Sequence, residues 1–478
     1  MVAAACAERQ TPTALDRLHP CATDEGPVDA YCGTLRVFEN RAAHEGRTID
    51  LKIVLWPALR ADAQPDPLFF LAGGPGQGAA KMGRQVRDAF RRTQTNRDLV
   101  LVDQRGTGDS HPLNCRPAEN DSLKALNEPD RVGLDRLRHC LESYDADPRF
   151  YTTSIAMDDL DDVRGYLGYD RINLYGGSYG TRAALVYLRQ HENRVRAMVL
   201  DGVAPPDMQL PLFMARDGQR ALDKLAADCA ADAGCSAQYP NLAERTRALL
   251  ARLQRDPAPV RLTHPRTGIA EDVTVDATFV ANVIFSALYS PLTSSLVPEL
   301  IKRAETNDFQ GLLALGLAGE GAGENMSAGM QLSVICAEDY PRITADAMVQ
   351  AAKDTVFGER LLTTRVEACK FWPRGTVPAG YYDPVVSAVP ALVLSGDLDP
   401  ITPPVWGESV TRHLSNARHL IVPGNGHIAL SSGCGGRIVG EFIEKGSSAD
   451  LNTGCLKAMK RPPFVLSPAG PDPTGSPE

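Results

Sequence analysis

The sequence predicts an α/β fold with a mostly parallel central sheet, interrupted by an inserted, mainly helical segment. Short strand-like runs alternate with stretches of helical periodicity up to about residue 204. Around Pro205 the pattern changes, and it stays mainly helical to about Gly375. The alternation returns from Pro390 onward. Because strands that alternate with helices are typical of parallel sheets, we expect one sheet domain that the helical stretch interrupts.

Each expected strand is a short run of apolar, β-branched or aromatic residues bounded by Gly, Pro or Asp. The runs are Thr34–Phe38, Asp50–Trp56, Leu68–Leu71, Leu99–Val102, Ile172–Tyr175, Ala197–Leu200, Pro390–Leu394 and Ala417–Val422. Helices are expected at Ser154–Leu167, with Ser154 as the N-cap, and at Thr181–Gln190. The uncharged stretch Ala277–Pro298 contains many polar residues, so it predicts a buried helix that breaks at Pro291 rather than a membrane span.

These patterns divide the 478 residues into five parts. We expect a remnant or linker at 1–16, the sheet domain at 17–204 and 376–465, the helical insertion at 205–375, and a disordered tail at 466–478. The chain has 50 Lys and Arg against 59 Asp and Glu, a net charge of -9, and no long basic run. This balance argues against nucleic acid or an anionic membrane surface as the main partner.

Eleven cysteines point to an oxidising compartment. Zinc-type C-x-x-C spacing is absent from the sequence. Ten of the cysteines are sequence neighbours: Cys21 and Cys32, Cys115 and Cys140, Cys229 and Cys235, Cys336 and Cys369, Cys434 and Cys455. Spacing alone does not prove these pairs, and eleven reduced thiols are the alternative. We favour disulfides and therefore a secreted or periplasmic protein.

The N-terminus has neither a charged region nor an apolar core, so it is no complete signal peptide. The run Val2–Cys6 resembles the end of a bacterial lipoprotein signal. This would make the unpaired Cys6 a lipid anchor, and no transmembrane span is expected elsewhere.

Gly176-Gly-Ser-Tyr-Gly180 fits the pattern G-x-S-x-G, with Ser178 at its centre. The pattern alone is weak, but here an expected strand ends directly before it and an expected helix begins directly after it. A nucleophile elbow needs this strand–turn–helix context, and its glycines keep side chains out of a tight turn. Ser178 is therefore the predicted nucleophile.

A serine hydroxyl needs a base, so the motif predicts an acid and a histidine further along the chain. One expected strand runs into Ser395-Gly-Asp-Leu-Asp-Pro400, and the next into Pro423-Gly-Asn-Gly-His427. Open α/β sheets carry their sites at such strand ends. We assign His427 as the base and Asp399 as the acid that orients it, with Asp397 as the alternative acid. His413 and His419 fall inside expected elements and are interpreted as structural.

The tetrahedral intermediate of such a reaction needs hydrogen-bond donors for its oxyanion. The glycine-rich run Ala72–Gly76 follows an expected strand. We predict that the donors are the N–H of Gly74, with that of Gly73 as the second candidate, and the N–H of Tyr179. A phosphate-binding loop is disfavoured because Pro75 removes a donor and no Lys-Ser/Thr follows.

Four aspartates, Asp158, Asp159, Asp161 and Asp162, resemble a metal cluster. We interpret them as a solvated helix face, and we expect neither a metal nor an organic cofactor.

Three motifs stand out together: Ala72-Gly-Gly-Pro-Gly76, Asp103-Gln-Arg-Gly-Thr-Gly-Asp-Ser110 and Gly176-Gly-Ser-Tyr-Gly-Thr181. They resemble the proline iminopeptidase family of α/β-hydrolases, and more closely its exported tripeptidyl-aminopeptidase-like branch. Similar residues continue to Pro463-Phe464, so the resemblance covers about residues 17–465. It implies the α/β-hydrolase fold, a helical cap formed by the insertion, and cleavage of short peptides from a free N-terminus. It also supports Asp399, since the family's acid is the fourth residue of a Gly-x-x-Asp turn.

The resemblance further implies that acidic cap residues bind the α-amino group of the substrate. Glu338 matches best and Asp339 second, while ordinary surface charge or a salt bridge is the alternative. One departure is Ala72, where proline iminopeptidases usually carry histidine, so a preference for proline alone is in doubt. Asp103 and Arg105 are interpreted as structural organisers below the site.

Three hypotheses about function follow. The first is an exported serine aminopeptidase acting on short peptides. The second is a carboxylesterase or amidase for small non-peptide substrates, because the same triad attacks either bond. The third is a binding module on a hydrolase fold, which is disfavoured because all three triad residues are present.

Overall fold

The computed structural model describes residues 13–23, 26–115, 123, 130–323, 326–467 and 470. A nine-stranded sheet with the order β1-β2-β3-β5-β4-β6-β7-β10-β11 forms its centre. The pairs from β1 to β5 along this order are antiparallel, and all pairs from β5 to β11 are parallel. The strands are β1 (His19–Thr23), β2 (Gly26–Phe38), β3 (Thr48–Trp56), β4 (Leu68–Leu71), β5 (Leu99–Val102), β6 (Ile172–Gly177), β7 (Val195–Asp201), β10 (Ala391–Gly396) and β11 (Ala417–Val422). The predicted mostly parallel α/β sheet is confirmed.

Every expected strand is present, and β4, β5 and β11 have the predicted bounds. The sequence patterns missed β1, which lies at the edge of the sheet and pairs only with β2. Pro20 within it lowers the strand signal, but an edge strand tolerates proline because one side of it needs no ladder hydrogen bonds.

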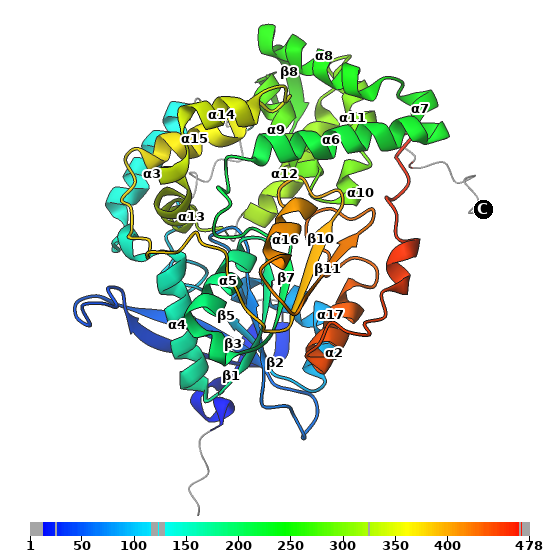
Figure 1. Ribbon diagram of the computed structural model, residues 1–478. Helices are drawn as coiled ribbons and strands as arrows, with labels where there is room; N and C mark the ends of the chain where they lie inside the picture. The colour runs from blue at the N-terminus through cyan, green and yellow to red at the C-terminus, as the bar shows by residue number, and fades with distance from the viewer. Residues whose placement is uncertain are drawn as a thin grey trace, which may run out of the picture.

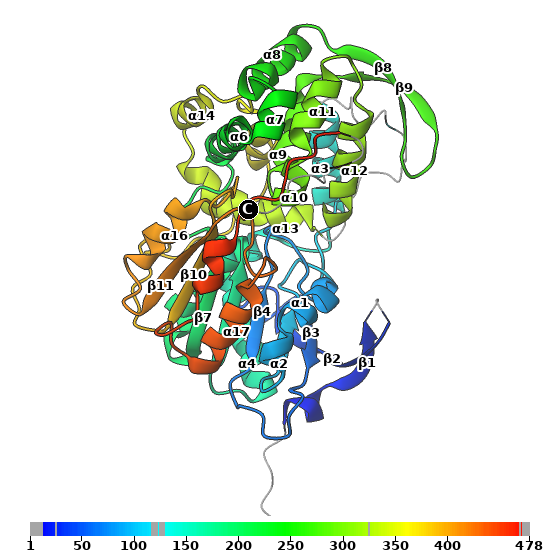
Figure 2. The ribbon, with the colours of Figure 1, turned by 90° about the vertical axis from the view of Figure 1, so that its right-hand side faces the viewer.

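The two faces of the sheet bury separate cores because side chains alternate along each strand. On one face Phe69 and Leu71 pack with α4 (Thr153–Leu167) and α5 (Tyr179–His191). On the other face Leu68 and Phe70 pack with α1 (Gly83–Ala89) and α17 (Gly435–Lys445). Figure 2 shows the sheet between these two helical layers. Burial on both faces explains why the central strands are continuous apolar runs.

Helix α4 begins at Thr153 and its N-cap is Thr152, so the prediction of Ser154 as the N-cap was wrong. The Oε1 atom of Glu338 accepts the N–H of Thr153 at 2.7 Å. A carboxylate from a distant segment thus satisfies this helix end, which local sequence signals could not reveal.

The segment between β7 and β10 forms a layer over the carboxyl end of the sheet (Figure 1). We call this layer the cap. Its helices are α6 (Met214–Ala231), α7 (Ala233–Gln238), α8 (Leu242–Arg255), α9 (Ala277–Ala287), α10 (Pro291–Ser294), α11 (Val297–Ala304), α12 (Gln310–Gly323), α13 (Ala328–Val334), α14 (Ala345–Ala352) and α15 (Arg360–Cys369). A hairpin of β8 (Ala258–Thr263) and β9 (Ala270–Val275) interrupts the helices. Helix α3 (Asp130–Ser143), from the first half of the chain, also packs against α13 and α15.

The uncharged stretch Ala277–Pro298 forms α9 and α10, and Pro291 is the first residue of α10. Proline suits this position because its missing N–H would have no partner there. In the part of the chain that the structure describes, no helix combines the length and the apolar character needed to cross a membrane.

Five disulfides join the cysteine neighbours that the sequence suggested: Cys21–Cys32, Cys115–Cys140, Cys229–Cys235, Cys336–Cys369 and Cys434–Cys455. The expectation of disulfide bonds therefore agrees with the structure. Cys6 and most of the tail at 466–478 lie outside the described residues.

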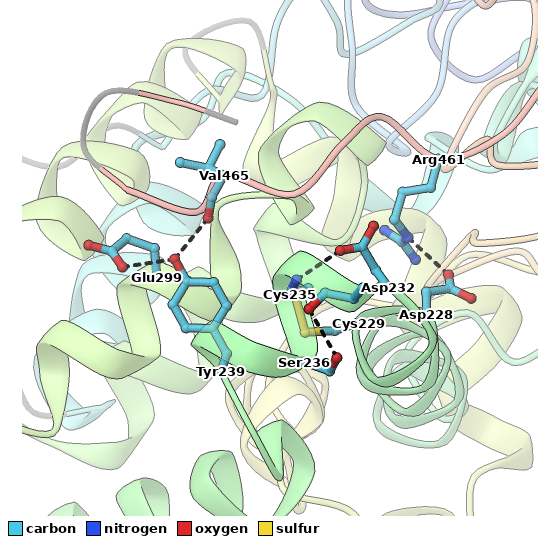
Figure 3. The surroundings of a disulfide bond; sticks show 10 residues. Asp228, Cys229, Asp232, Cys235, Ser236, Tyr239, Glu299, Arg461 and Val465 are labelled. Atoms are coloured by element: carbon cyan, nitrogen blue, oxygen red, sulfur yellow. Dashed lines mark hydrogen bonds and ion pairs between the residues drawn. A yellow bond between two sulfur atoms is a disulfide. The ribbon is translucent and has the colours of Figure 1, made fainter. Parts of the chain in front are cut away.

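Residues 461–466 return from the sheet domain to the cap, and we call them the C-terminal strap (Figure 3). Arg461 donates to Asp228 at 2.9 Å. The Val465 oxygen lies 2.9 Å from the Tyr239 hydroxyl, close to the Cys229–Cys235 disulfide that ties α6 to α7. Phe464 is buried in the apolar core of the cap. The strap therefore forms a further connection between cap and sheet domain.

Candidate active site

Ser178 lies at the sharp turn between β6 and α5, with φ 57° and ψ -125°. A Cβ atom at Gly180 would lie 2.2 Å from the Leu71 oxygen, and one at Gly176 would lie 2.3 Å from the Gly180 oxygen. Side chains at these two positions would therefore collide with backbone. The glycines of the motif are required by packing, and the turn has the form of a nucleophile elbow.

Asp399 and His427 come from the turns after β10 and β11, and the structure brings them together. The Asp399 Oδ2 atom lies 2.8 Å from Nδ1 of His427. Asp399 is fully buried. A carboxylate that holds Nδ1 leaves Nε2 free to take a proton, as the base of a serine hydrolase must.

Thr402 completes this arrangement. Its backbone N–H donates to Asp399 Oδ1 at 2.8 Å, and its hydroxyl donates to Asp399 Oδ2 at 2.8 Å. Sequence reasoning missed Thr402, although a hydroxyl residue three positions after the acid is a usual local hydrogen-bond donor. These donors keep the carboxylate ionised and fixed in orientation.

Electrostatics adapt the pair to base catalysis. Burial alone would lower the pKa of His427, but the charge of Asp399 and its hydrogen bond raise that pKa above the usual value. Burial would raise the pKa of Asp399, but His427 and the donors of Thr402 and Ile401 lower it below its usual value. Each group therefore stabilises the charged form of the other.

Asp201, at the end of β7, fixes the loop that carries His427. Its carboxylate accepts the N–H groups of Ala429 and Leu430, both at 2.8 Å, and the hydroxyl of Tyr175 at 2.8 Å. The role of Asp201 escaped the sequence analysis because the two N–H groups that it holds, those of Ala429 and Leu430, lie 228 and 229 residues further along the chain.

Of the predicted oxyanion residues, Gly73 and Tyr179 adjoin Ser178, and Gly74 lines the same cavity. A Cβ atom at Gly73 would lie 3.1 Å from Ser178 Cβ and 3.7 Å from its Oγ, so the Gly73 backbone adjoins the nucleophile. Gly74 has φ 110°, a conformation that favours glycine. Tyr179 is the first residue of α5, so its N–H has no acceptor within the helix. The three predicted residues thus lie on the two segments that adjoin Ser178.

A cavity of about 450 Å³ lies between the sheet edge and the cap. Ser178, His427, Gly73 and Gly74 line it from the sheet domain, and residues of the cap cover it. Most of its wall is apolar; the cap residues on it include Leu210, Met214, Tyr289, Met326, Gln331, Ile335 and Arg365. The backbone oxygen of Tyr289 also accepts the backbone N–H of His427 at 2.8 Å. The Tyr289 ring packs against the imidazole, with 5.2 Å between the ring centroids. The cap therefore contacts the predicted base directly.

Glu338 and Asp339 do not line this cavity among the described residues. They are fully buried and share Arg182, with N···O distances of 3.4 and 3.1 Å. Glu338 also accepts hydrogen bonds from Thr153 and Tyr381. Burial raises the pKa of both carboxyl groups, and the charge of Arg182 opposes that rise. This arrangement matches the salt bridge that was the alternative interpretation.

Replacing Arg182 with methionine is expected to reduce the free energy of unfolding by about 3–5 kcal/mol, because two buried carboxylates lose their cation. The raised pKa values of Glu338 and Asp339 determine how the stability of this variant changes with pH. Without Arg182 these pKa values rise further, so the folded state takes up protons as the pH falls. The deficit of the variant should therefore shrink from neutral to mildly acidic pH. Urea unfolding of both proteins at the two pH values measures it.

The matched control is Arg216→Met, since Arg216 pairs with Asp217 in the cap but is about half exposed. We expect little change in stability for this variant at either pH. A deficit of Arg182→Met that stayed constant or grew toward acidic pH would contradict the role of the buried carboxylates.

The remaining residues discussed from sequence lie away from the reaction centre. Asp397 pairs with Lys224 at 3.7 Å, and His419 bonds to Ser395 at 2.9 Å. The interpretation of the four aspartates as a solvated face was wrong for Asp159, which is buried against Arg105 at 2.6 Å. Sequence spacing could not reveal this pair, because Arg105 lies on another segment. Among the described residues no cluster of three or more His, Cys, Asp or Glu side chains could hold a metal.

Comparisons with known proteins show which proteins this chain resembles. A model of the α/β hydrolase fold matches residues 66–236, and a model of TAP-like proteins matches residues 354–455. Serine protease Hip1 of Mycobacterium tuberculosis is 28% identical over 447 residues, which cover 85% of this chain and 83% of that protein. Proline iminopeptidase of Neisseria gonorrhoeae is 32% identical over 139 residues, 29% of this chain and 32% of the relative. A solved proline iminopeptidase from Mycobacterium smegmatis aligns with 87% of this chain and 98% of its own at a TM-score of 0.41 and 15% identity.

The fold and these matches define an α/β hydrolase, and the chain is a serine hydrolase of that superfamily. The chain is similar to TAP-like proteins over residues 354–455 and to serine protease Hip1 and proline iminopeptidase, which confirms the resemblance seen in the sequence.

Proposed function

We propose that the chain is an exported serine peptidase that cleaves short peptides from a free N-terminus. The observation that carries this proposal is the 2.8 Å contact of Asp399 with His427 on the wall of a cavity that also contains Ser178. The names of its relatives, serine protease and proline iminopeptidase, support the peptide substrate. The five disulfides support export, because such bonds persist in oxidising compartments.

The reaction would proceed through an acyl-enzyme. His427 takes the proton of the Ser178 hydroxyl, and Oγ attacks the scissile carbonyl. The N–H groups of Tyr179 and Gly74, with Gly73 as the second candidate, stabilise the oxyanion. His427 then protonates the leaving amine. In the second half of the reaction His427 takes a proton from a water molecule, which attacks the acyl-enzyme, and His427 returns that proton to Ser178 as the acyl group leaves.

The cap supports an exopeptidase mode. A cavity of about 450 Å³ accommodates a short peptide segment, whereas a folded chain would collide with the cap. The predicted binding of the substrate ammonium by Glu338 and Asp339 would require them to leave Arg182. We therefore propose uncharged acceptors on the cavity wall, among them Gln77, Gln85 and Gln331, as the first alternative.

A second candidate function is hydrolysis of small esters or amides. The observation that favours it is the mostly apolar wall of the cavity, which suits an uncharged acyl group.

A matched substrate panel tests both functions. It compares fluorogenic aminoacyl and tripeptidyl amides with a free amine, the same compounds after N-acetylation, and a short-chain nitrophenyl ester. Cleavage restricted to the free-amine amides would support the aminopeptidase. Equal turnover of blocked and free compounds, with fast ester hydrolysis, would overturn it in favour of the second candidate. If Glu338→Gln keeps the fold but loses the preference for free-amine substrates, Glu338 would be the residue that binds the substrate ammonium group.

A further inference from the structure

Arg365, on α15 of the cap, lines the same cavity as Ser178 and His427. Apart from His427, it is the one Asp, Glu, Lys, Arg or His residue among the described residues of the cavity wall. No aspartate or glutamate of the described chain lines this space. The cavity therefore presents a positive charge to whatever occupies it.

The guanidinium of Arg365 has few partners. Its Nη1 atom donates to the Leu361 oxygen at 2.8 Å, one turn back on its own helix. Among the described residues no carboxylate forms an ion pair with it. Arg105 and Arg182, by contrast, are buried and paired with Asp159 and with Glu338 and Asp339.

Burial lowers the pKa of Arg365, and the neighbouring Tyr289 opposes this effect only in part. An arginine remains charged in proteins, and Arg365 is partly exposed and has no carboxylate partner among the described residues, so its charge is open to a ligand in the cavity. The unused N–H donors of a guanidinium form a fork that matches a carboxylate. Such a group gains most from a ligand that brings both a negative charge and two acceptor atoms.

Tyr289 links Arg365 to the reaction centre. It lines the same cavity as Arg365, and its ring packs on the imidazole of His427. A substrate whose scissile carbonyl lies at Ser178 would therefore extend its adjoining residues toward Arg365.

We propose that Arg365 forms a subsite for a substrate carboxylate, so that the preferred substrates are short peptides with an acidic side chain or a free C-terminus close to the scissile bond. This inference rests on the proposed peptidase function and names the substrate class of the same site. It also gives a physical reason for a cap that covers the cavity, since a covered cavity strengthens the attraction between charges.

The experiment uses three tetrapeptides of the same length with a free N-terminus. The first is a C-terminal amide with glutamine near the scissile bond, the second has glutamate in that place, and the third keeps glutamine but has a free C-terminus. Cleavage by the full chain is followed by mass spectrometry. We expect kcat/KM for one charged peptide to exceed that for the neutral one by about 100-fold. The peptide that shows the preference identifies which carboxylate Arg365 binds.

Arg365→Met should reduce this preference to about threefold or less while leaving the neutral peptide within about threefold of the original protein. Arg365→Lys should keep part of the preference, because the charge remains but the fork is lost. Arg360→Met is the matched control: Arg360 begins the same helix and lies outside the cavity wall, so its replacement should leave the preference unchanged.

A preference that survives in Arg365→Met, or a full-length protein that does not discriminate among the three peptides, would overturn the subsite. Thermal unfolding of Arg365→Met provides the structural control. Removal of an uncompensated charge should not lower the unfolding midpoint, whereas loss of a structural salt bridge would lower it. If no peptide is cleaved but esters are, the proposed peptidase function fails separately. The subsite is then tested with esters of a neutral acid and of a dicarboxylic acid of equal length.

Discussion

Ser178→Ala is expected to lower kcat for peptide amides by about 10⁶-fold, because the acyl-enzyme can no longer form. Alanine keeps the Cβ atom and the backbone conformation of the elbow, so the fold should be unchanged. Steady-state kinetics with a free-amine fluorogenic amide measure the loss, and thermal unfolding with circular dichroism verifies the fold.

A fluorophosphonate probe provides an independent check of the nucleophile. It should label the original protein at one serine and should not label Ser178→Ala. Amide hydrolysis that remained comparable in the variant, or labelling at another serine, would exclude Ser178 as the nucleophile and with it the proposed mechanism.

The second large effect is expected for Asp399→Asn, which should lower kcat by about 10⁴-fold. Asparagine fills the same space, but its amide can present N–H to Nδ1 of His427 and so stabilise the wrong tautomer. Loss of the charge also removes the main cause of the raised pKa of His427. Kinetics across neutral and alkaline pH would show both effects.

Asp397→Asn is the matched control, since Asp397 lies two residues earlier on the same turn and pairs with Lys224. We expect its kcat to stay within about threefold of the original value. If Asp397→Asn were the inactive variant and Asp399→Asn the active one, the acid would have to be reassigned.

The sheet could be predicted from sequence because its signals are local. Leu68–Leu71 follows Pro67, and Leu99–Val102 lies between Asp98 and Asp103. Both are uninterrupted apolar runs, and both form strands with those bounds. The edge strand His19–Thr23 escaped because its formation depends on pairing with β2 and not on its own composition. The hairpin β8–β9 inside the cap escaped for the same reason, as its exposed alternating residues give a weak signal.

In the candidate site, too, the residues with local sequence signals could be predicted and those placed by long-range packing could not. Ser178, Asp399 and His427 follow strand ends, so a parallel sheet alone suffices to predict that they meet. The surroundings of Glu338 could not be predicted, because its partners Thr153 and Arg182 come from helices more than one hundred and fifty residues earlier. Arg365 likewise lies in an ordinary helical pattern, and only the packing of the cap shows that it reaches the cavity.

The order of these parts along the chain also has a consequence for synthesis. Ser178 is synthesised first, the cap follows, and Asp399, His427 and the C-terminal strap come after the cap. Domains form as their residues become available. A chain that has been synthesised only as far as the cap therefore carries Ser178 without His427 and Asp399, the base and acid of the proposed mechanism. The strap, whose Arg461 and Phe464 engage the cap, can contact it only after both parts of the sheet domain have been made.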